Sequence, residues 1–362
     1  MKRILVIEPY YGGSHKSFLD GLAAAVDAHF TLMSLPARKW KMRMQLSAPW
    51  FIGQIEALPT SARHFDTVLF SSFVDVAVFK AMTQSVDGWN SRCRLCTYFH
   101  ENQFAYPGFL DKRTNHQFTA INFTTALTSD STAFNSHFNR SAFLNQCRKY
   151  LAKATDMDLS PSAVRLEEKS TVLYPGMDFT TIDRLKGGRT LHSVPRIIWN
   201  HRWEHDKNPE AFVDALCRLA GDGLDFELAI LGRTFRNRPP CFEALRRELG
   251  DRIVHYGYVA AKEAYCRCLI DGDIVVSTAL HEFFGLSILE AVRAGCLPVL
   301  PDRLVYPELF DERFLYDENG LYERLRTAVK EAERLPGEEA MRLTEPFDWR
   351  HQAPAYARWL GI

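Results

Sequence analysis

The chain has 362 residues, of which 46% are hydrophobic, and this is enough sequence and apolar surface for two domains with a core each. Its 44 basic and 44 acidic side chains cancel, so no overall field favours nucleic acid, although a local basic patch stays possible. The eight cysteines lack a regular spacing, which argues against a disulfide framework and favours a reduced, intracellular protein. The first apolar run, residues 4–7, is too short for a signal peptide, and no stretch approaches about 18 apolar residues. We therefore expect a cytoplasmic protein with no membrane partner.

The N-terminal half begins with a strand and a glycine-rich turn. Apolar residues 3–7 have the length of a buried parallel strand, and apolar positions at helical spacing follow between residues 18 and 26. The turn between them contains Gly12-Gly13, which does not match the dinucleotide signature G-x-G-x-x-G. His15 and Lys16, at the helix start, are candidates to contact phosphate or acceptor hydroxyl groups. The alternative is an ordinary capped turn whose His and Lys are solvated.

A basic run follows at residues 38–43. Four of its six residues are cations, interleaved with Trp40 and Met42. This composition suits a surface that neutralises phosphates and stacks a base. Charge runs are also commonly solvated surfaces, so both interpretations stay open. The cations are Arg38, Lys39, Lys41 and Arg43.

Polar side chains follow a predicted strand at residues 94–100, which comes after an earlier strand at residues 67–72 and a helix that reaches about residue 82. Open α/β sheets bind ligands at the carboxyl ends of such strands. We therefore expect a functional role for this polar run, with His100 as the first candidate to contact a donor sugar or an acceptor. The run consists of His100, Glu101, Asn102 and Gln103.

Two further strands and a glycine pair mark the end of the N-terminal half. Residues 126–130 predict a short strand that leads into a helix near residue 134, and residues 170–174 predict the last strand. Gly187-Gly188 follow, and the strand pattern restarts at residue 195. We therefore place the domain boundary near residue 190.

Two cations lie five residues apart just after the first strand of the second half, residues 195–200. Arg202 can fork around a phosphate and Lys207 can act as a point charge, so together they suit a diphosphate. The helix that follows starts at Pro209, a residue favoured at the first helical position. The remaining strands are expected at residues 226–232, 253–259 and 274–277. Three arginines after the first of these could supply cations to an anionic acceptor: Arg233, Arg236 and Arg238.

A strand, a glycine turn and a helix start come together at residues 274–294, with a carboxylate on each side of Gly285. Unpaired amides at residues 284–286 would point along the positive end of the helix dipole, where a phosphate is stabilised. Glu282 and Glu290 would be separated on a helix by a rise of roughly 12 Å. A glycosidase pair lies about 5–9.5 Å apart, so these residues are better suited to the two ends of one long ligand. An ordinary strand-to-helix turn is the alternative.

The pattern Glu282-x-Phe284-Gly285-x4-Glu290 resembles the donor-site motif of the retaining GT-B glycosyltransferases. The resemblance implies that Glu282 lies beside the donor sugar, that Glu290 binds the ribose hydroxyls and that Arg202-x4-Lys207 clamps the diphosphate. Because those cations and the helix start would stabilise the leaving group, we expect no metal and no cofactor besides the nucleotide sugar. The implied donor-binding residues are Gly12, Gly13, Arg202, Lys207, Tyr258, Phe284, Gly285, Leu286 and Glu290, and the implied catalytic residues are His100 and Glu282.

The same resemblance implies an α/β fold of the GT-B type, with two Rossmann-like, doubly wound domains that face an interdomain cleft. An N-terminal domain, residues 1–190, would bind the acceptor. A C-terminal domain, residues 191–345, would bind the nucleotide sugar. The amphipathic, aromatic-rich residues 346–362 would form a helix that crosses back and packs on the N-terminal domain.

Three N-terminal motifs narrow the resemblance to one acceptor. The chain resembles the tRNA-queuosine mannosyltransferase family over nearly its whole length, and this implies transfer of mannose from GDP-mannose to the cyclopentenediol of queuosine in tRNA. The motifs are Ile4-Leu5-Val6-Ile7-Glu8-x2-Tyr11-Gly12-Gly13-Ser14-His15-Lys16, Tyr98-Phe99-His100-Glu101-Asn102-Gln103-x2-Tyr106-Pro107 and Phe134-Asn135-Ser136. The implied acceptor and tRNA contacts are His15, Lys16, Arg38, Lys39, Lys41, Arg43, Glu101, Asn102 and Gln103.

Two other functions stay open at this point. A related retaining transferase would act on a glycan, a lipid or a small molecule. A non-catalytic protein would use the same motifs to bind a nucleotide or RNA. For a transferase we expect same-face attack by the acceptor hydroxyl, because no well-placed enzymic nucleophile is evident.

Overall fold

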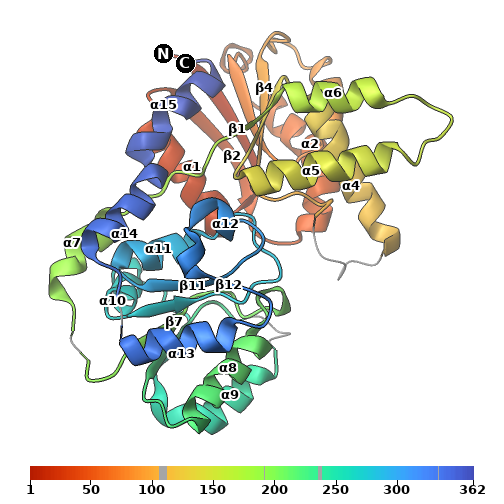
Figure 1. The fold of residues 1–362 in the computed structure, drawn as a ribbon. Coiled ribbons are helices and arrows are strands. Elements are labelled where there is room, and N and C mark those ends of the chain that lie inside the picture. The colour runs from red at the N-terminus through yellow and green to blue at the C-terminus, as the bar shows by residue number, and fades with distance from the viewer. Residues whose placement is uncertain (106–111, 191, 235–238, 333) are drawn as a thin grey trace. The chain divides into compact units, whose positions relative to one another are not determined.

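The computed structural model describes residues 1–105, 112–190, 192–234, 239–332 and 334–362 (Figure 1). The chain divides into two compact units: unit 1 contains Met1–Met177 and Trp349–Ile362, and unit 2 contains Asp178–Asp348. The predicted boundary near residue 190 therefore lies inside unit 2. The helix α7, Thr180–Leu185, belongs to unit 2 because its Asp183 accepts two hydrogen bonds, of 2.8 and 2.6 Å, from the buried guanidinium of Arg293.

Unit 1 is built on a parallel sheet of six strands in the order β2-β1-β3-β4-β5-β6. Its central strands are short apolar runs, as expected for a parallel sheet that is covered on both faces. β1 pairs in register with β2 from Arg3 to Glu8, and the register shifts between Glu8 and Tyr11, at the carboxyl end of the strand. The strands span Arg3–Tyr11 (β1), His29–Pro36 (β2), Thr67–Ser71 (β3), Arg94–Phe99 (β4), Ser131–Phe134 (β5) and Ser170–Val172 (β6).

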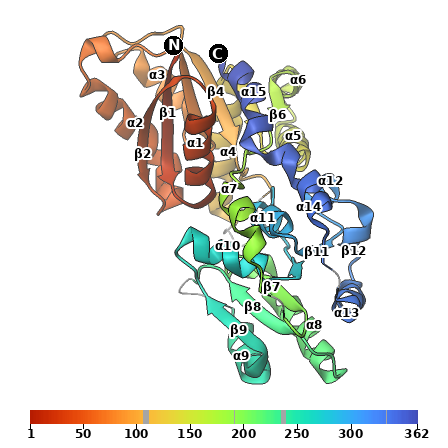
Figure 2. The same cartoon turned by 90° about the vertical axis from the view of Figure 1, so that its left-hand side faces the viewer.

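Helices cover both faces of this sheet (Figure 2). Because side chains alternate along a strand, Ile4 and Val6 of β1 pack against α1 and α15, whereas Leu5 and Ile7 pack against α2 and α3. Unit 1 thus has one core on each side of the sheet. Its helices span Gly13–Ala25 (α1), Trp40–Glu56 (α2), Val76–Thr83 (α3), Lys112–Thr128 (α4), His137–Leu151 (α5), Ser160–Glu168 (α6) and Trp349–Leu360 (α15).

The C-terminal helix α15 packs on the N-terminal half of the chain, as the family resemblance implied. It lies beside α1 (Figure 1). The indole of Trp349 fits over two glycines: a Cβ added to Gly21 would lie 1.9 Å from it, and one added to Gly176 would lie 2.1 Å from it. The hydroxyl of Tyr356 donates to the carbonyl of Tyr174 at 3.0 Å. Aromatic packing and close approach at glycine therefore attach the end of the chain to unit 1.

Unit 2 repeats the architecture with its own parallel six-stranded sheet, in the order β12-β11-β10-β7-β8-β9. All four strands predicted for this half are present, as is the helix that starts at Pro209. The strands span Arg196–Trp199 (β7), Glu227–Leu231 (β8), Ile253–Gly257 (β9), Ile274–Val276 (β10), Leu297–Pro301 (β11) and Leu315–Tyr316 (β12). The helices after α7 span Pro209–Gly221 (α8), Cys241–Leu249 (α9), Lys262–Ile270 (α10), Leu286–Ala294 (α11), Tyr306–Leu309 (α12), Leu321–Glu331 (α13) and Gly337–Thr344 (α14).

Each sheet has a point at which the strand order reverses. In unit 1 this point lies between β1 and β3, and in unit 2 it lies between β7 and β10. The connections on the two sides of such a point leave in opposite directions, which opens a crevice outside the carboxyl ends of the strands. The loops after these strands are therefore where a doubly wound domain places its ligands, and they contain the predicted site residues Gly12, Arg202, Lys207, Glu282, Phe284 and Gly285.

One predicted strand is wrong. Residues 126–128 are the last turn of α4, and the strand is β5, which begins at Ser131. The hydroxyl of Ser129 donates to the carbonyl of Thr125 at 2.8 Å and so closes the end of the helix. A short apolar run of this kind fits the buried end of a helix as well as it fits a strand, because periodicity does not separate the two over so few residues.

All eight cysteines are free thiols. Cys96, Cys147 and Cys296 lie in the cores and act as small apolar side chains. Among the helices that the structure describes, none combines the length and the apolar character that crossing a membrane requires.

Candidate active-site residues in each unit

In unit 2, buried Lys207 and partly buried Glu282 form an ion pair at the point of strand reversal. Lys207 follows β7 and Glu282 follows β10, the two strands at that point. The ammonium of Lys207 is 6% exposed and lies 3.2 Å from Oε2 of Glu282. It also donates to the carbonyl of His281 at 2.6 Å and lies 3.3 Å from Oδ2 of Asp206. The structure thus brings together Lys207, which was predicted to bind the donor, and Glu282, which was predicted to be catalytic.

The carboxylate of Glu282 is held in its charged form. Burial alone would raise its pKa, but the charge of Lys207 and hydrogen bonds lower this pKa to about 2. Its Oε1 accepts from the amides of Phe283 and Phe284 at 3.1 and 3.3 Å. The amide of Phe284, which the sequence predicted to point at a phosphate, is therefore directed to this carboxylate.

The start of α11 keeps the predicted anion-binding geometry at Gly285 and Leu286. Gly285 precedes the helix with a φ of +90°, a left-handed conformation that favours glycine, and no side chain caps the helix. The first amides of a helix have no intrahelical acceptor. Together with the helix dipole, this start offers hydrogen-bond donors to a phosphate.

Glu290, on α11, belongs to a second, partly buried network. Its Oε2 accepts from the hydroxyl of Tyr265 at 3.0 Å, and that hydroxyl accepts from Nδ2 of Asn200 at 3.2 Å. Nδ2 of Asn200 also donates to the carbonyl of Ser287 at 2.7 Å. Burial raises the pKa of Glu290, and the Tyr265 hydrogen bond opposes this increase. The network orients Glu290 and ties it to the first turn of the helix.

Arg202 and Tyr258, the other predicted donor residues of unit 2, lie at the surface. The side chain of Arg202 is 51% exposed, and its guanidinium lies 2.9 Å from Oε2 of Glu204. Tyr258 is 60% exposed, and the guanidinium of Arg233 lies 5.7 Å from its ring centroid. Both predicted donor residues therefore have accessible side chains. Arg236 and Arg238, predicted as possible acceptor contacts, lie outside the described residues.

Unit 1 places an imidazole between two carboxyl groups at its own point of strand reversal. Nδ1 of His15 lies 2.9 Å from Oε2 of Glu8, and its Nε2 lies 3.5 Å from Oε1 of Glu101. Burial alone would lower the pKa of His15, but Glu8 and Glu101 raise it to about 10. His15 is therefore a buried imidazolium at neutral pH. Glu8 also accepts from the hydroxyl of Ser71 at 3.2 Å.

His100 lies against this imidazolium and is neutral. Its ring centroid is 4.1 Å from that of His15, and it packs edge-on against Phe18 and Tyr98. Burial and the charge of His15 lower the pKa of His100 well below its usual value. His100 can therefore donate and accept hydrogen bonds without carrying a charge.

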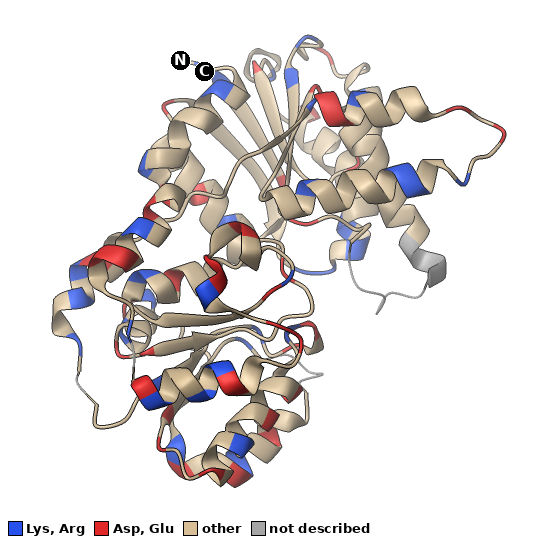
Figure 3. Cartoon of the chain, viewed as in Figure 1, with Lys and Arg blue, Asp and Glu red and all other residues tan. Residues whose placement is uncertain are grey.

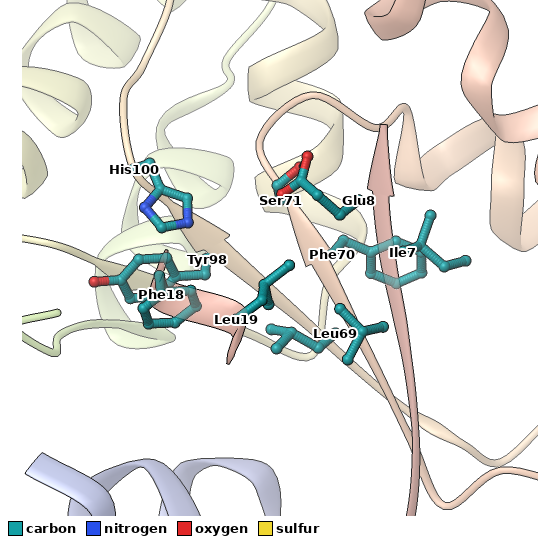
Figure 4. A pocket seen from close by; sticks show the side chains of 10 residues that line it. Ile7, Glu8, Phe18, Leu19, Leu69, Phe70, Ser71, Tyr98 and His100 are labelled. Carbon is teal, nitrogen blue, oxygen red and sulfur yellow. The ribbon is translucent and has the colours of Figure 1, made fainter. Parts of the chain in front are cut away.

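Figure 4 shows a small cavity beside these residues, with His100, Phe18 and Tyr98 on one side and Glu8 and Ser71 on the other. Its volume is about 10 Å³, which is the size of a single water site. The cavity is too small for a sugar ring, so it is part of the packing behind the histidines.

The loop after His100 is held by a cluster of buried asparagines. Asn102 is fully buried, donates to Oδ1 of Asn139 at 2.7 Å and accepts from the amide of Ala105 at 2.9 Å. Asn122 accepts from the amide of Gln103 at 2.8 Å, and Asn135 donates to the carbonyl of His100 at 2.7 Å. Asn102, predicted to contact the acceptor, therefore holds the loop. Gln103 is also buried, and its Oε1 has no hydrogen-bond partner among the residues that the structure describes.

The two glycines of the first turn have different surroundings. A Cβ on Gly12 would lie 2.5 Å from Cβ of Ala37, so Gly12 lets the loops after β1 and β2 touch. Gly13 has a φ of +54° and open space where a Cβ would be. Of these two glycines, only Gly13 thus leaves open space for a ligand to approach the backbone. Lys16 is exposed and pairs with Asp20 on the next turn of α1.

The predicted basic run lies at the start of α2. Arg38, Lys39 and Lys41 are exposed, and Arg43 is half-buried. Trp40, between them, stacks on Phe73 with ring centroids 6.0 Å apart. Three of the four predicted cations are therefore available to a ligand.

Sequence reasoning missed Glu8, His201, Tyr265 and the asparagine cluster. A charged residue inside the apolar run of β1 is a signal that would have identified Glu8, because buried carboxylates are seldom left unpaired. His201 is buried beside the Lys207 pair, and burial and the charge of Lys207 lower its pKa to about 4. Tyr265 and the asparagines carry no local signal. Within the described residues, no group of three or more His, Cys, Asp or Glu converges as a metal site would require.

In comparisons with known proteins, each unit matches a family model. Residues 3–177 match the model of the tRNA-queuosine alpha-mannosyltransferase N-terminal family, and residues 190–346 match that of glycosyl transferases group 1. The tRNA-queuosine alpha-mannosyltransferase of Drosophila melanogaster is 36% identical over 332 residues, which cover 89% of this chain and 85% of that protein.

Two more distant similarities agree with this. A GDP-mannose-dependent alpha-(1-6)-phosphatidylinositol dimannoside mannosyltransferase of Mycobacterium tuberculosis is 27% identical over 208 residues, 54% of each chain. The structure of a sucrose-phosphate synthase from Thermosynechococcus elongatus superposes with a TM-score of 0.73 at 15% identity, covering 99% of this chain and 98% of that one. Two α/β units of this kind make the fold GT-B. The chain belongs to the tRNA-queuosine alpha-mannosyltransferase family of nucleotide-sugar-dependent glycosyltransferases.

Proposed function

We propose that this chain transfers mannose from GDP-mannose to a hydroxyl of the cyclopentenediol of queuosine in tRNA, with retention of the anomeric configuration. The acceptor is supported by the match of residues 3–177 to the family's N-terminal model and by the Drosophila relative. The donor is supported by the mycobacterial relative, whose name specifies GDP-mannose. Because the acceptor is tRNA, we propose a cytoplasmic location.

The observation that carries the proposal is the Lys207–Glu282 ion pair beside the open start of α11. A diphosphate suits this place, because a buried ammonium and free helix amides both stabilise an anion. Arg202, exposed on the same turn, adds a second cation. Glu282 would then accept a hydroxyl hydrogen bond from the sugar, and Glu290 would accept hydrogen bonds from the ribose.

The chemistry needs one bond broken and one formed. The bond between the anomeric carbon and the diphosphate oxygen breaks, and GDP leaves with the electron pair. The acceptor oxygen bonds to the same face of that carbon, and its proton passes to the departing diphosphate. Lys207 and the start of α11 would lower the barrier by stabilising the negative charge that develops on the leaving group.

For unit 1 we propose that His100 gives a neutral hydrogen-bonding group to the reacting sugars. The imidazolium of His15 keeps His100 unprotonated, and Glu8 and Glu101 balance the charge of His15. Glu101, with a side chain that is 20% exposed, is the member of this cluster that a diol hydroxyl can reach. The exposed cations of the basic run would contact the phosphates of the tRNA.

The test is a matrix of donors and acceptors. Purified protein is incubated with GDP-mannose, GDP-glucose, UDP-glucose or UDP-galactose and with tRNA that contains or lacks queuosine, and nucleosides are analysed by mass spectrometry. We expect one added hexose on queuosine with GDP-mannose only, and none on tRNA that lacks queuosine. Transfer to a phosphoinositide or another lipid, with queuosine left unmodified, would instead favour the glycan, lipid or small-molecule alternative. Nucleotide or RNA binding without turnover in any combination would favour the non-catalytic alternative.

A further inference from the structure

The solvent face of α2 carries an unusual apolar stripe. Met42, Leu46 and Trp50 are 50%, 54% and 44% exposed, and they follow one another at intervals of four residues, which places them on one side of the helix. The opposite side of α2 packs into unit 1 through Met44, Ala48, Phe51, Ile52 and Ile55, all of them buried. The helix is therefore packed against unit 1 through its other side, and not through the stripe.

All charged residues at positions 28–55, a range that includes most of α2, are basic. No Asp or Glu occurs between Asp27 and Glu56, whereas the exposed cations Arg38, Lys39 and Lys41 lie at the start of α2. In the net-neutral chain, acidic and basic residues are mixed along most other helices (Figure 3). Cations at the start of a helix oppose its dipole. Lys41 lies over the ring of Trp40 and Trp50 packs edge-on against Phe51, but much of the surface of the stripe and of the cations stays exposed, so we look to a ligand for both.

A chain of ring contacts connects the start of α2 to the candidate site of unit 1, through the side of the helix that faces the core. Trp40 at the start of α2 stacks on Phe73, and Phe73 stacks on His15 with ring centroids 5.4 Å apart. His15 in turn contacts His100. From Met42 to Trp50 the stripe then extends for about 12 Å along the helix, the length of roughly three stacked nucleotides. A strand of RNA whose modified base is at His100 therefore has α2 within its reach.

We propose that the α2 face, made of Arg38, Lys39, Lys41, Met42, Leu46 and Trp50, binds unpaired nucleotides of the acceptor RNA next to the modified one. This rests on the proposed function and adds to it a place where the substrate is held. The cations contact phosphates, and Trp50 stacks on an unpaired base, with Met42 and Leu46 beside it. An aromatic side chain reads bases that are splayed out of a helix, so the surface selects single-stranded RNA over duplex.

A second copy of the chain fits this face poorly. A two-fold contact would bring the same patch from both copies together, and so would place three cations against three cations with no acidic residue from 28 to 55 to compensate. RNA provides the complementary charge and an apolar base surface at once. The observations thus favour RNA, and self-association becomes an outcome of the test.

The test measures binding of a queuosine-containing anticodon stem-loop by fluorescence anisotropy, without sugar donor, between 50 and 300 mM salt. Trp50→Ala should raise the Kd about 5-fold or more, the minimum expected for one lost base stack, at every salt concentration. Trp50→Phe should recover most of the affinity. The double variant Lys39→Ala/Lys41→Ala should instead reduce the slope of log K against log salt by about 1.4, since two phosphate contacts to a single strand are lost.

Matched controls separate this surface from a general effect on unit 1. Met42→Ala should weaken binding, whereas Met157→Ala, the same change at a methionine that is 57% exposed elsewhere in unit 1, should not. Removing the bases beside queuosine in the stem-loop should weaken binding to the wild type but not to Trp50→Ala. If both proteins lose the same affinity, Trp50 does not stack on those bases and the proposal is overturned.

Further outcomes decide between the inference and the function on which it rests. Wild-type-like affinity of Trp50→Ala, no RNA binding by the wild type, or a dimer that Trp50→Ala converts to a monomer would each overturn the α2 inference. RNA binding that depends on Trp50, in a protein that adds no hexose to queuosine, would support the surface and remove the proposed reaction. Binding and turnover are measured separately so that the two failures are distinguishable.

Discussion

The carboxyl ends of the two sheets use charge in opposite ways. In unit 2 a buried ammonium, Lys207, lies between the carboxyl groups of Asp206 and Glu282 beside the open helix start. In unit 1 a buried imidazolium, His15, lies between Glu8 and Glu101, and the ring next to it, His100, is neutral. Under the proposed function, the first arrangement would offer fixed charge to an anionic leaving group. The second would offer neutral hydrogen bonding to hydroxyl groups, and its own charges are paired.

This difference predicts whether a mutation in each unit lowers the activity or the stability of the protein. The charged groups around Lys207 border the proposed ligand site. Removing one of these charged groups should therefore affect catalysis first. Around His15 each charge has a partner within the protein, so removing one should affect folding as well. Four experiments test this contrast, in order of expected effect.

The largest effect is expected for Lys207→Met. The variant leaves the partly buried Glu282 without its cation, which should destabilise unit 2 by about 3–5 kcal/mol and lower kcat by about 100-fold or more. The double variant Lys207→Met/Glu282→Gln should recover stability but not activity. Thermal unfolding measures the stability, and initial rates measure the activity. Lys262→Met is the control, because Lys262 pairs with Asp178 at the surface. A double variant that regains activity would contradict the catalytic role of the pair.

The next effect is the pH dependence contributed by His15. Folding raises its pKa from 6.5 to about 10, so its stabilisation is complete below about pH 6.5 and is lost as the pH rises toward 10. His15→Gln should therefore be less stable than the wild type at pH 6, and the difference should shrink steadily up to pH 10. Urea unfolding over this pH range measures it, with exposed His29→Gln as control. A difference that stays constant with pH would mean that folding does not change the pKa of His15.

A smaller effect is expected where the loops of unit 1 touch. Gly12→Ala brings a Cβ to 2.5 Å from that of Ala37, so one loop has to move, at a cost of about 1–3 kcal/mol. Ala37→Gly in the same chain should restore most of the lost stability, because it removes the atom that clashes. Gly53→Ala, on α2 where a Cβ meets nothing, is the control. If Ala37→Gly gives no rescue, the glycine is needed for another reason, such as ligand approach.

The smallest effect is expected for Tyr265→Phe, which removes only the hydroxyl between Asn200 and Glu290. A network hydrogen bond contributes about 0.5–1.5 kcal/mol, so the KM for the donor should rise about 2- to 12-fold with little change in kcat. Tyr322→Phe, which removes a hydroxyl bonded to Asp222 at the surface, should change neither constant. A fall in kcat at unchanged KM would show that Glu290 acts on the reacting centre.

The fold was predictable in most of its parts, because parallel strands are continuous apolar runs and the second half repeats the pattern of the first. The strand at 126–130 failed because the end of α4 is equally apolar. The compact units divide at Met177 and not near residue 190, because the tie between Asp183 and Arg293 joins residues that are 110 positions apart. No local pattern records a contact over that distance.

The two candidate sites also differed in how far a local sequence pattern could predict them. Glu282, Gly285 and Glu290 lie in one short stretch, so spacing alone indicated an anion site. The cluster of unit 1 takes Glu8 from β1, His15 from α1 and Glu101 from the loop after β4, and only the fold brings them together. Asn102 shows the converse: a polar run after a strand indicated ligand contacts, and part of that run holds the loop itself.

The return of α15 to unit 1 has a consequence for a chain that ends early. Trp349, Tyr356, Trp359 and Leu360 belong to the same core as Ile4 and Val6 of the first strand. That core is complete only when residues 349–362 are in place, whereas unit 2 is contiguous and does not depend on them. A nonsense mutation near residue 349 would expose apolar surface at the opposite end of the sequence while leaving the proposed nucleotide-sugar unit intact.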